Sequence, residues 1–396
     1  MRILVCAAGA PLPPLNGARL QLTHLCRELA KRHEICVLAY RWPDQQGHPP
    51  AGVEVLSLPP PERSRAARAS TLARALVRAE PPAVTALTGA MKSAIRELLG
   101  RRSFDVAQVA GSAMAGVASA LEPLPAVLGP VDTWHLNVSA AATLEGSRTA
   151  RLRRRLNERL VRRFGATAYR PYRRVVAVSP EDARILRELD PTVRFEVVPN
   201  GVDVDYFAPS PAVAAEPGLI VFVGAMQWAP NVQAAQWLVH SVLPRVRARR
   251  PDARVAIVGR QPTPEVLSMA GLDGVEVTGE VPDVRPWLWR AHAVACPMVS
   301  GTGIKNKLLE ALACGAPCVA TSLACQGVDV SADEHLLVAD SAERFAESVV
   351  ALLADSRLRA RVGAAGRALA VEHHSWDGAA RGYERIYELA LRESTR

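Results

Sequence analysis

The sequence contains no long uncharged apolar segment. Across its 396 residues no run reaches the roughly 18 apolar residues that a membrane-spanning helix needs. The apolar run after Arg2 soon meets Pro11, and a helical pattern begins only several residues later, so a buried first strand explains it better than a signal peptide. We therefore expect a cytoplasmic protein without a transmembrane helix.

Cysteine pairs are also missing. The chain has seven Cys but no Cys-x-x-Cys, and Cys314 and Cys318, four apart, have no second pair at the spacing of a zinc site. Seven free thiols are typical of buried cysteines in a reducing compartment. The sequence predicts neither a disulfide framework nor a metal.

The C-terminal half of the chain has no excess of positive or negative charge. Residues 210–396 carry 19 Lys and Arg against 20 Asp and Glu, whereas residues 1–209 carry 29 against 19. The excess is densest at 148–174, where 11 Arg accompany one acid, Glu158, and leucines recur near helical spacing. A solvated helix face, docking to anionic lipid and contact with an anionic acceptor all remain open. Nucleic acid is not expected, because interleaved aromatics and known binding motifs are absent.

Short apolar runs alternate with helical patterns in both halves of the chain. The N-terminal half contains RILVCAA, EICVLAY, VEVLSL, DVAQVAG, AVLGPVD and RVVAVS, and the C-terminal half contains LIVFVGAM, ARVAIVGR, VEVTGE, AVACPM and PCVAT. This pattern predicts an α/β protein with two Rossmann-like, doubly wound domains of parallel strands. Such sheets bind ligands at the carboxyl ends of their strands, so we expect the two domains to face a central cleft.

The expected domains are separated by a Pro-rich linker. We expect an N-terminal domain at 1–195, the linker at 196–217, a C-terminal domain at 218–375, and a last helix over 376–396 that packs back toward the first domain.

The densest group of candidate binding residues lies at 299–321, VSGTGIKNKLLEALACGAPCVAT. A small-residue loop runs into a helix, whose first N–H groups and dipole favour a phosphate. Lys305 and Lys307 can add charge, and Glu310 can accept hydrogen bonds from ribose hydroxyls. On spacing alone, a plain strand-to-helix turn with solvated lysines explains the segment equally well.

This segment resembles the nucleotide-sugar loop and helix of the family 4 glycosyltransferases, which have the GT-B fold. Further matches are PNGVDVDYFAP to the family's interdomain segment, VFVGAMQWAPN to the first donor-domain strand in a subgroup with a GxMxWxPN loop, VAIVGR and VTGEVPDVRPWL to later donor-side strands, and NGARLQLTHLCRELAKRHEICVL to the first glycine loop and helix. The resemblance covers nearly the whole chain, most strongly 195–330 and most weakly 60–170.

The resemblance implies roles for individual residues. Glu310 would hold the donor ribose, the loop from Gly301 to Lys305 would receive the diphosphate through backbone N–H groups, and Gly17 would approach the diphosphate from the other domain. The complete set of expected donor-binding residues is Gly17, Gly224, Gly259, Arg260, Glu280, Val281, Gly301, Thr302, Gly303, Ile304, Lys305, Asn306 and Glu310.

The sequence departs from the family's pattern at two places. Many relatives carry an acidic residue eight positions before the helix Glu, where this chain has Thr302. Many also place an Arg and a Lys after the first donor-domain strand, where this chain has AMQWAPN. We expect Lys305 to take over that charge, with help from Arg285.

The expected acceptor contacts follow a predicted strand in GPVDTWHLNVS. Asp132 and His135 are candidates to contact or orient the acceptor hydroxyl, and with Lys305 they form the expected catalytic set. A turn-capping Asp and a buried His are the alternative interpretation. No metal site is implied, since the Asp-x-Asp at 203–205 lies in the linker.

The resemblance implies a hexosyltransferase-like enzyme. It would move a sugar from a nucleotide diphosphate sugar, UDP favoured over GDP, to a hydroxyl acceptor with retention of anomeric configuration and without a cofactor. A nucleotide-sugar epimerase of similar fold and a non-catalytic nucleotide-sugar-binding relative remain alternatives. The acceptor stays open between a polysaccharide or lipid-linked intermediate and a secondary metabolite. Peripheral contact with the inner face of an anionic membrane through 148–174 is an open alternative to a purely cytoplasmic location.

Overall fold

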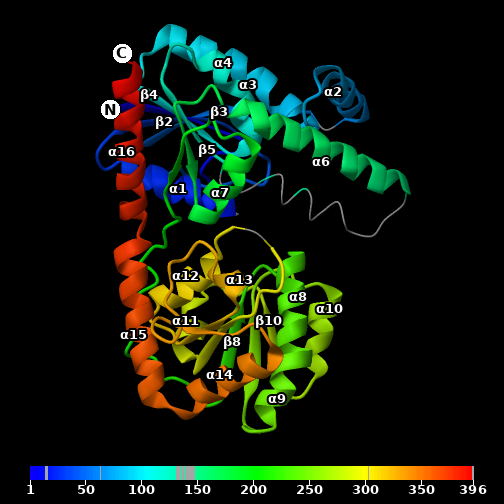
Figure 1. Ribbon diagram of the computed structural model, residues 1–396, viewed down its shortest axis with the longest axis vertical. Coiled ribbons are helices and arrows are strands. Elements are labelled where there is room, and N and C mark those ends of the chain that lie inside the picture. Colours follow the sequence, from blue (N-terminus) through cyan, green and yellow to red (C-terminus); the bar gives the residue numbers. More distant parts are fainter. Residues whose placement is uncertain are drawn as a thin grey trace. The chain divides into compact units, whose positions relative to one another are not determined.

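The computed structural model describes residues 1–13, 17–62, 64–130, 134, 138, 148–301 and 303–394. The chain forms two compact units: unit 1 comprises Met1–Pro199 and Ala379–Arg396, and unit 2 comprises Asn200–Gly378 (Figure 1). The linker expected at 196–217 thus begins in unit 1 and continues in unit 2. No helix among the described residues is long and apolar enough to cross a bilayer.

Unit 1 is built on a seven-stranded sheet in the order β3-β2-β1-β4-β5-β6-β7, and every pair of neighbours is parallel. Its strands are β1 (Arg2–Ala7), β2 (Glu34–Tyr40), β3 (Val53–Leu58), β4 (Val106–Ala110), β5 (Ala126–Gly129), β6 (Arg174–Ala177) and β7 (Phe195–Val197). The central strands are buried, as in β1, where only Arg2 is exposed. Burial on both faces explains why they read as continuous apolar runs.

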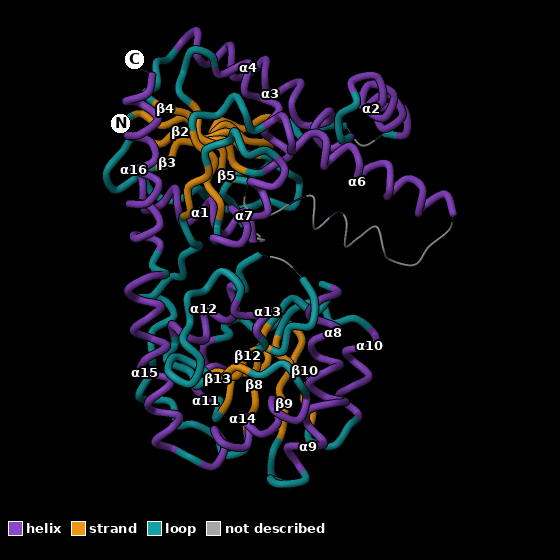
Figure 2. The backbone as a smooth tube through the Cα atoms, in the orientation of Figure 1, coloured by secondary structure: helices purple, strands orange, loops and turns teal. Residues whose placement is uncertain are grey.

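Helices lie on both faces of this sheet (Figure 2). The helices of unit 1 are α1 (Gly17–Leu29), α2 (Arg65–Arg78), α3 (Pro82–Arg101), α4 (Ala118–Leu121), α6 (Arg148–Ala168), α7 (Pro180–Leu189) and most of α16 (Trp376–Ser394), and α2 packs on α3. The start of α7 shows why a helix begins there: the Ser179 hydroxyl accepts a hydrogen bond from the Asp182 N–H at 3.0 Å, and Pro180 occupies the first turn.

The last helix, α16, contributes to the core of unit 1 from Ala379 onward. Both terminal nitrogens of Arg174 donate to the Glu393 carboxylate at 2.7 Å, and the buried Tyr387 hydroxyl donates to Gln108. A Cβ on Gly129 would lie 2.9 Å from the Tyr383 hydroxyl, so β5 and α16 pack closely where that strand has no side chain. These contacts place the final segment of the chain on the N-terminal sheet.

Unit 2 has a six-stranded parallel sheet in the order β10-β9-β8-β11-β12-β13. Its strands are β8 (Leu219–Val223), β9 (Arg254–Val258), β10 (Val275–Gly279), β11 (Ala293–Cys296), β12 (Cys318–Ala320) and β13 (Leu337–Val338). Its helices are α8 (Ala229–Trp237), α9 (Leu243–Arg247), α10 (Pro264–Leu267), α11 (Arg285–Arg290), α12 (Asn306–Ala313), α13 (Ser322–Cys325), α14 (Ala342–Ala354) and α15 (Ser356–His373).

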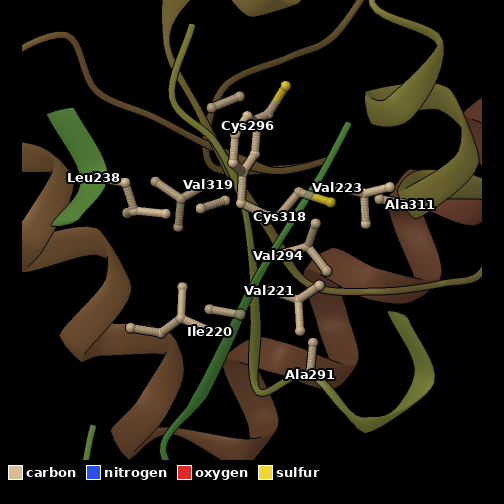
Figure 3. Packing of buried hydrophobic residues seen from close by; sticks show 14 of the residues in the cluster. Ile220, Val221, Val223, Leu238, Ala291, Val294, Cys296, Ala311, Cys318 and Val319 are labelled. Atoms are coloured by element: carbon tan, nitrogen blue, oxygen red, sulfur yellow. The ribbon is translucent and has the colours of Figure 1, made fainter. Parts of the chain in front are cut away.

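The core of unit 2 lies around its central strands. Figure 3 shows Val221 of β8 beside Val294 of β11, and Ile220 on the other side of the strand, where Leu238 and Val319 also lie. From β8 the chain first builds one side of the sheet through β9 and β10, then returns to build the other side through β11. The strand order therefore reverses beside β8, which is where doubly wound sheets bind ligands.

These two sheets confirm the predicted α/β class with two Rossmann-like domains. The expectation that the domains face a common cleft stays a prediction.

Candidate functional site

A cavity of about 300 Å³ lies in unit 2 at the carboxyl ends of β8, β9 and β10. Three strand-to-helix loops and α12 line this open cavity. The lining residues are Val223, Gly224 and Ala225 after β8, Gly259 and Arg260 after β9, Glu280, Val281 and Val284 after β10, and Lys307 and Glu310 on α12. Its position beside the switch in strand order is that of a ligand site in a doubly wound sheet.

Two glycines form the floor of this cavity. Gly259 has φ +150°, and a Cβ there would lie 1.7 Å from the Gly224 carbonyl oxygen. Hydrogen bonds hold the same loops, since the Gly224 N–H donates to Val258 at 3.0 Å and the Gly259 N–H donates to Gly279 at 3.1 Å. Only glycine fits at 259, because the Gly224 backbone occupies the space that a Cβ would need.

Lys307 is a cation in the cavity wall, and Asn231 holds it in place. The Lys307 ammonium donates to the Asn231 side-chain oxygen and lies 5.1 Å from the centre of the Phe222 ring. The Asn231 amide also donates to the Ala225 carbonyl at 2.9 Å, which ties the loop after β8 to α12. Burial lowers the pKa of Lys307 from its ordinary value. The Asn of the Trp-Ala-Pro-Asn motif therefore positions the one lysine that lines this cavity.

Glu310 lies three residues after Lys307, on the same face of α12. Burial raises the pKa of its carboxyl group to about 7, and the nearby Lys307 acts in the opposite direction. Near neutral pH the group is therefore divided between its acid and carboxylate forms. It can accept hydrogen bonds from the hydroxyl groups of a ligand when ionised.

Lys305 and Arg285, which were expected to supply positive charge, do not line the cavity. The Lys305 ammonium is buried in the loop before α12, where it donates to the Gly303 carbonyl at 2.6 Å and to the Gly301 carbonyl at 3.4 Å. The Arg285 guanidinium pairs with Asp283 at 2.7 Å and lies 3.8 Å from the centre of the Tyr206 ring. Both cations therefore hold local backbone and side-chain structure.

The structure brings together six of the residues predicted to bind the donor, and they are Gly224, Gly259, Arg260, Glu280, Val281 and Glu310. Gly301, Gly303, Ile304, Lys305 and Asn306 form the loop and first residue of α12 and are not among the lining residues. Gly17 begins α1 in unit 1. Thr302 and the candidate catalytic residues Asp132 and His135 lie outside the described residues.

The sequence analysis missed Asn231, and it named Lys307 only as a residue that can add charge while assigning the diphosphate to Lys305. Both carried a signal: Asn231 ends the Trp-Ala-Pro-Asn motif, and Lys307 stands one helical turn from Glu310.

No group of three or more potential ligands that could hold a metal is found in the part of the chain that the structure describes. In the Asp-x-Asp at 203–205, the Asp203 carboxylate accepts the Tyr206 N–H at 3.1 Å, which is a turn-capping contact.

Two doubly wound parallel units, one with a ligand cavity at the switch in strand order, place the chain in the GT-B class. Its fold resembles that of the sucrose-phosphate synthase (tll1590) from Thermosynechococcus elongatus, with a TM-score of 0.71 and 15% identity over 98% of both chains. At this identity the likeness concerns the fold alone.

Two family models match the chain. The model described as Glycosyltransferase Family 4 matches residues 15–206, and the model described as Glycosyl transferases group 1 matches residues 217–355. Together they cover most of the chain, which therefore belongs to family 4 of the glycosyltransferases, a family of enzymes. The resemblance drawn from the sequence motifs is thereby confirmed at the level of the family.

Curated relatives match over part of the chain. A phosphatidyl-myo-inositol mannosyltransferase of Mycobacterium leprae is 32% identical over 200 residues, 48% of this chain and 52% of that protein. A GDP-mannose-dependent alpha-(1-6)-phosphatidylinositol monomannoside mannosyltransferase of Mycobacterium tuberculosis is 30% identical over 221 residues, 49% of this chain and 56% of that protein. The chain thus matches about half the length of these relatives.

Proposed function

We propose that this protein transfers a hexosyl group from a nucleotide diphosphate sugar to a hydroxyl acceptor. The observation that carries the proposal is the cavity of unit 2, where Lys307, Glu310 and the glycine floor converge. In this proposal Glu310 accepts hydrogen bonds from the ribose, and the backbone at Gly224 and Gly259 allows close approach of the nucleotide. Lys307 supplies positive charge for the diphosphate.

The proposed reaction forms one bond to the anomeric carbon, breaks one bond to that carbon and moves one proton. The acceptor oxygen attacks the anomeric carbon of the sugar, and the bond between that carbon and the diphosphate oxygen breaks with its electron pair on the diphosphate. The acceptor proton leaves to a departing phosphate oxygen, or to Asp132 or His135, the predicted acceptor contacts. Catalysis then comes from orientation and from stabilisation of negative charge.

Retention of the anomeric configuration and independence from metals are part of the same proposal. Both rest on the family resemblance. The anomeric configuration of the product by NMR tests the first, and unchanged turnover after treatment with a chelator tests the second.

We propose GDP-mannose as the donor to test first. The sequence alone favoured uridine, whereas the named donor of a relative at 30% identity supports guanosine and mannose. The binding assay therefore compares GDP-mannose with UDP and UDP-sugars.

We propose a lipid-linked hydroxyl as the acceptor. The support is that two relatives at 30–32% identity are named for phosphatidylinositol acceptors. An enzyme with such an acceptor works at a membrane surface, which corresponds to the peripheral location among the sequence-based alternatives. Polysaccharide intermediates and secondary metabolites are the acceptors that a broad assay compares with it.

The first experiment is thermal stabilisation of the purified protein by GDP, GDP-mannose, UDP and UDP-glucose. Binding to the native state raises the melting temperature, so one nucleotide should shift it clearly. Glu310→Ala should abolish that shift, and Glu372→Ala, which removes an exposed carboxylate on α15, should preserve it. No shift with any nucleotide would overturn the proposal in favour of a non-catalytic relative. Conversion of the donor sugar without any acceptor would favour an epimerase.

A further inference from the structure

Apolar side chains on α2 and α6 of unit 1 are exposed. Leu72, Leu76 and Val77 of α2 are 46%, 52% and 88% exposed, and Leu152 and Leu156 of α6 are 71% and 42% exposed. Within the described part of the chain these are five of the 13 exposed large apolar side chains. Scattered exposed leucines are normal, but a concentration on two neighbouring helices marks an interaction surface.

The two helices also enclose an apolar groove of about 240 Å³. Leu72, Ala75 and Leu76 line it from α2, and Leu156 and Leu160 line it from α6. Arg153, Arg154 and Asn157 of α6 supply its polar lining. The groove and the exposed leucines together form what we term the α2–α6 surface, comprising residues 65–78 and 148–168.

The α2–α6 surface is strongly basic. Helix α2 carries four Arg and no acid, and helix α6 carries eight Arg and one acid, Glu158. No described carboxylate lies within ion-pair distance of Arg151, Arg153, Arg155 or Arg159, although other arginines of unit 1, such as Arg174, have carboxylate partners. Apolar side chains interspersed with arginines are the signature of a helix that lies in a membrane interface.

We propose that the α2–α6 surface docks on an anionic lipid bilayer, with its leucines and Val77 among the acyl chains and its arginines on the headgroup phosphates. The proposal deepens the proposed function and rests on it, because a lipid-linked acceptor is the reason for the enzyme to be at a membrane. Docking itself requires neither donor nor turnover.

Charge complementarity selects this occupant over two others. A second copy of the chain would bring the same excess of arginines to this surface, and like charges repel. A nucleic acid would use aromatic side chains for base stacking; α2 has none, and Phe164, the one aromatic residue of α6, is buried. An anionic bilayer satisfies both the charge and the apolar side chains. Long arginine side chains also reach headgroups while their stems cover apolar surface.

Vesicle co-sedimentation of the full chain tests the proposal without donor or acceptor. The protein should sediment with vesicles of equal parts phosphatidylcholine and phosphatidylglycerol, and much less with phosphatidylcholine alone. Raising the salt from about 0.1 M to about 1 M shortens the screening length from about 10 Å to about 3 Å, so binding should weaken steeply. Equal binding to both vesicle types would overturn the electrostatic part of the proposal.

Matched variants locate the binding surface. Leu76→Ser combined with Val77→Ser should weaken vesicle binding about tenfold. Leu267→Ser in unit 2 is the control, because Leu267 and Leu76 are both 52% exposed, and it should leave binding unchanged. Arg155→Gln combined with Arg159→Gln should weaken vesicle binding about 10- to 30-fold. Each arginine near an anionic surface contributes a similar amount to the free energy of binding, and this variant removes two. Arg357→Gln combined with Arg385→Gln removes two arginines of α15 and α16 and should have no such effect.

Failure of this inference is distinguishable from failure of the proposed function. Normal nucleotide-induced stabilisation with no vesicle binding would overturn the docking surface alone, and vesicle binding without nucleotide binding would overturn the transferase. If the protein were a dimer that Leu76→Ser with Val77→Ser converts to monomer, and vesicles were not bound, the surface would be an interface between copies instead. Salt-sensitive binding to RNA with no vesicle binding would likewise overturn the lipid proposal.

Discussion

In unit 2, Arg245, Arg247 and Arg250 each lie within 3.0 Å of a carboxylate oxygen, on Glu343, Asp273 and Asp252. In unit 1, the exposed arginines of α6 lie among apolar side chains instead. Both units have the same kind of parallel sheet. The comparison shows that the shared architecture does not decide what each unit recognises. Unit 2 presents a walled cavity, and unit 1 presents a charged surface.

The largest effect we expect is that of Gly259→Ala in unit 2. The new Cβ would lie 1.7 Å from the Gly224 carbonyl oxygen at a φ of +150°, so the loops after β8 and β9 must separate. We expect a loss of about 3 kcal/mol in the free energy of unfolding and loss of nucleotide-induced stabilisation. Denaturant unfolding measures the first and melting with nucleotide the second.

Gly271→Ala is the control for this substitution, because no atom lies within 4 Å of the position of its Cβ. Unchanged unfolding of Gly259→Ala would mean that the two loops do not touch.

A second prediction separates the two lysines of the donor segment. Lys307→Met should weaken binding of a nucleoside diphosphate about 10- to 100-fold and leave the weak binding of the nucleoside nearly unchanged, because it removes a charged partner of the phosphates. Lys305→Met should weaken both ligands alike, since its ammonium holds the carbonyls of the loop. Calorimetric titration of both ligands makes the comparison. A diphosphate-specific loss in Lys305→Met alone would restore the expectation drawn from the sequence.

A substitution in unit 1 tests whether nucleotide binding by unit 2 is independent of the stability of unit 1. Glu393→Gln removes the charge that both terminal nitrogens of Arg174 contact at 2.7 Å, so we expect a loss of about 2 kcal/mol in the stability of unit 1. Glu388→Gln on the same helix removes an exposed carboxylate 4.0 Å from Arg392 and should cost much less. Nucleotide-induced stabilisation should survive both changes. Its loss in Glu393→Gln would show that the two units do not act independently.

The last effect we expect is a pH dependence of the stability of unit 2. Burial raises the pKa of Glu310 from 4.5 to about 7. The unfolded chain therefore releases the Glu310 proton at a lower pH than the folded chain does. The stability contributed by the neutral group is complete below about pH 4.5 and is lost as the pH rises through about 7. Glu310→Gln should therefore equal the unmodified protein in stability at pH 4 and exceed it at pH 8. A stability difference that did not vary with pH would contradict the raised pKa.

The alternation of apolar runs and helical patterns predicted two parallel sheets because strands buried on both faces are apolar throughout their length. The segment at 299–321 could also be identified from the sequence, because a small-residue loop and the helix after it are contiguous in the chain. Asn231 escaped this reasoning because its partners, the Ala225 carbonyl and Lys307, include a residue 76 positions away.

The sequence by itself determined the α/β class, the family and the place of Glu310 in a helix that follows a small-residue loop, because these depend on periodicity and on contiguous motifs. Only the tertiary structure decided which lysine lines the cavity. Lys305 precedes α12 with an extended backbone, and its ammonium donates to carbonyls of the loop, whereas Lys307 lies within the helix. The α2–α6 surface was likewise decided by the fold, because its two walls are distant in the chain and meet only through packing.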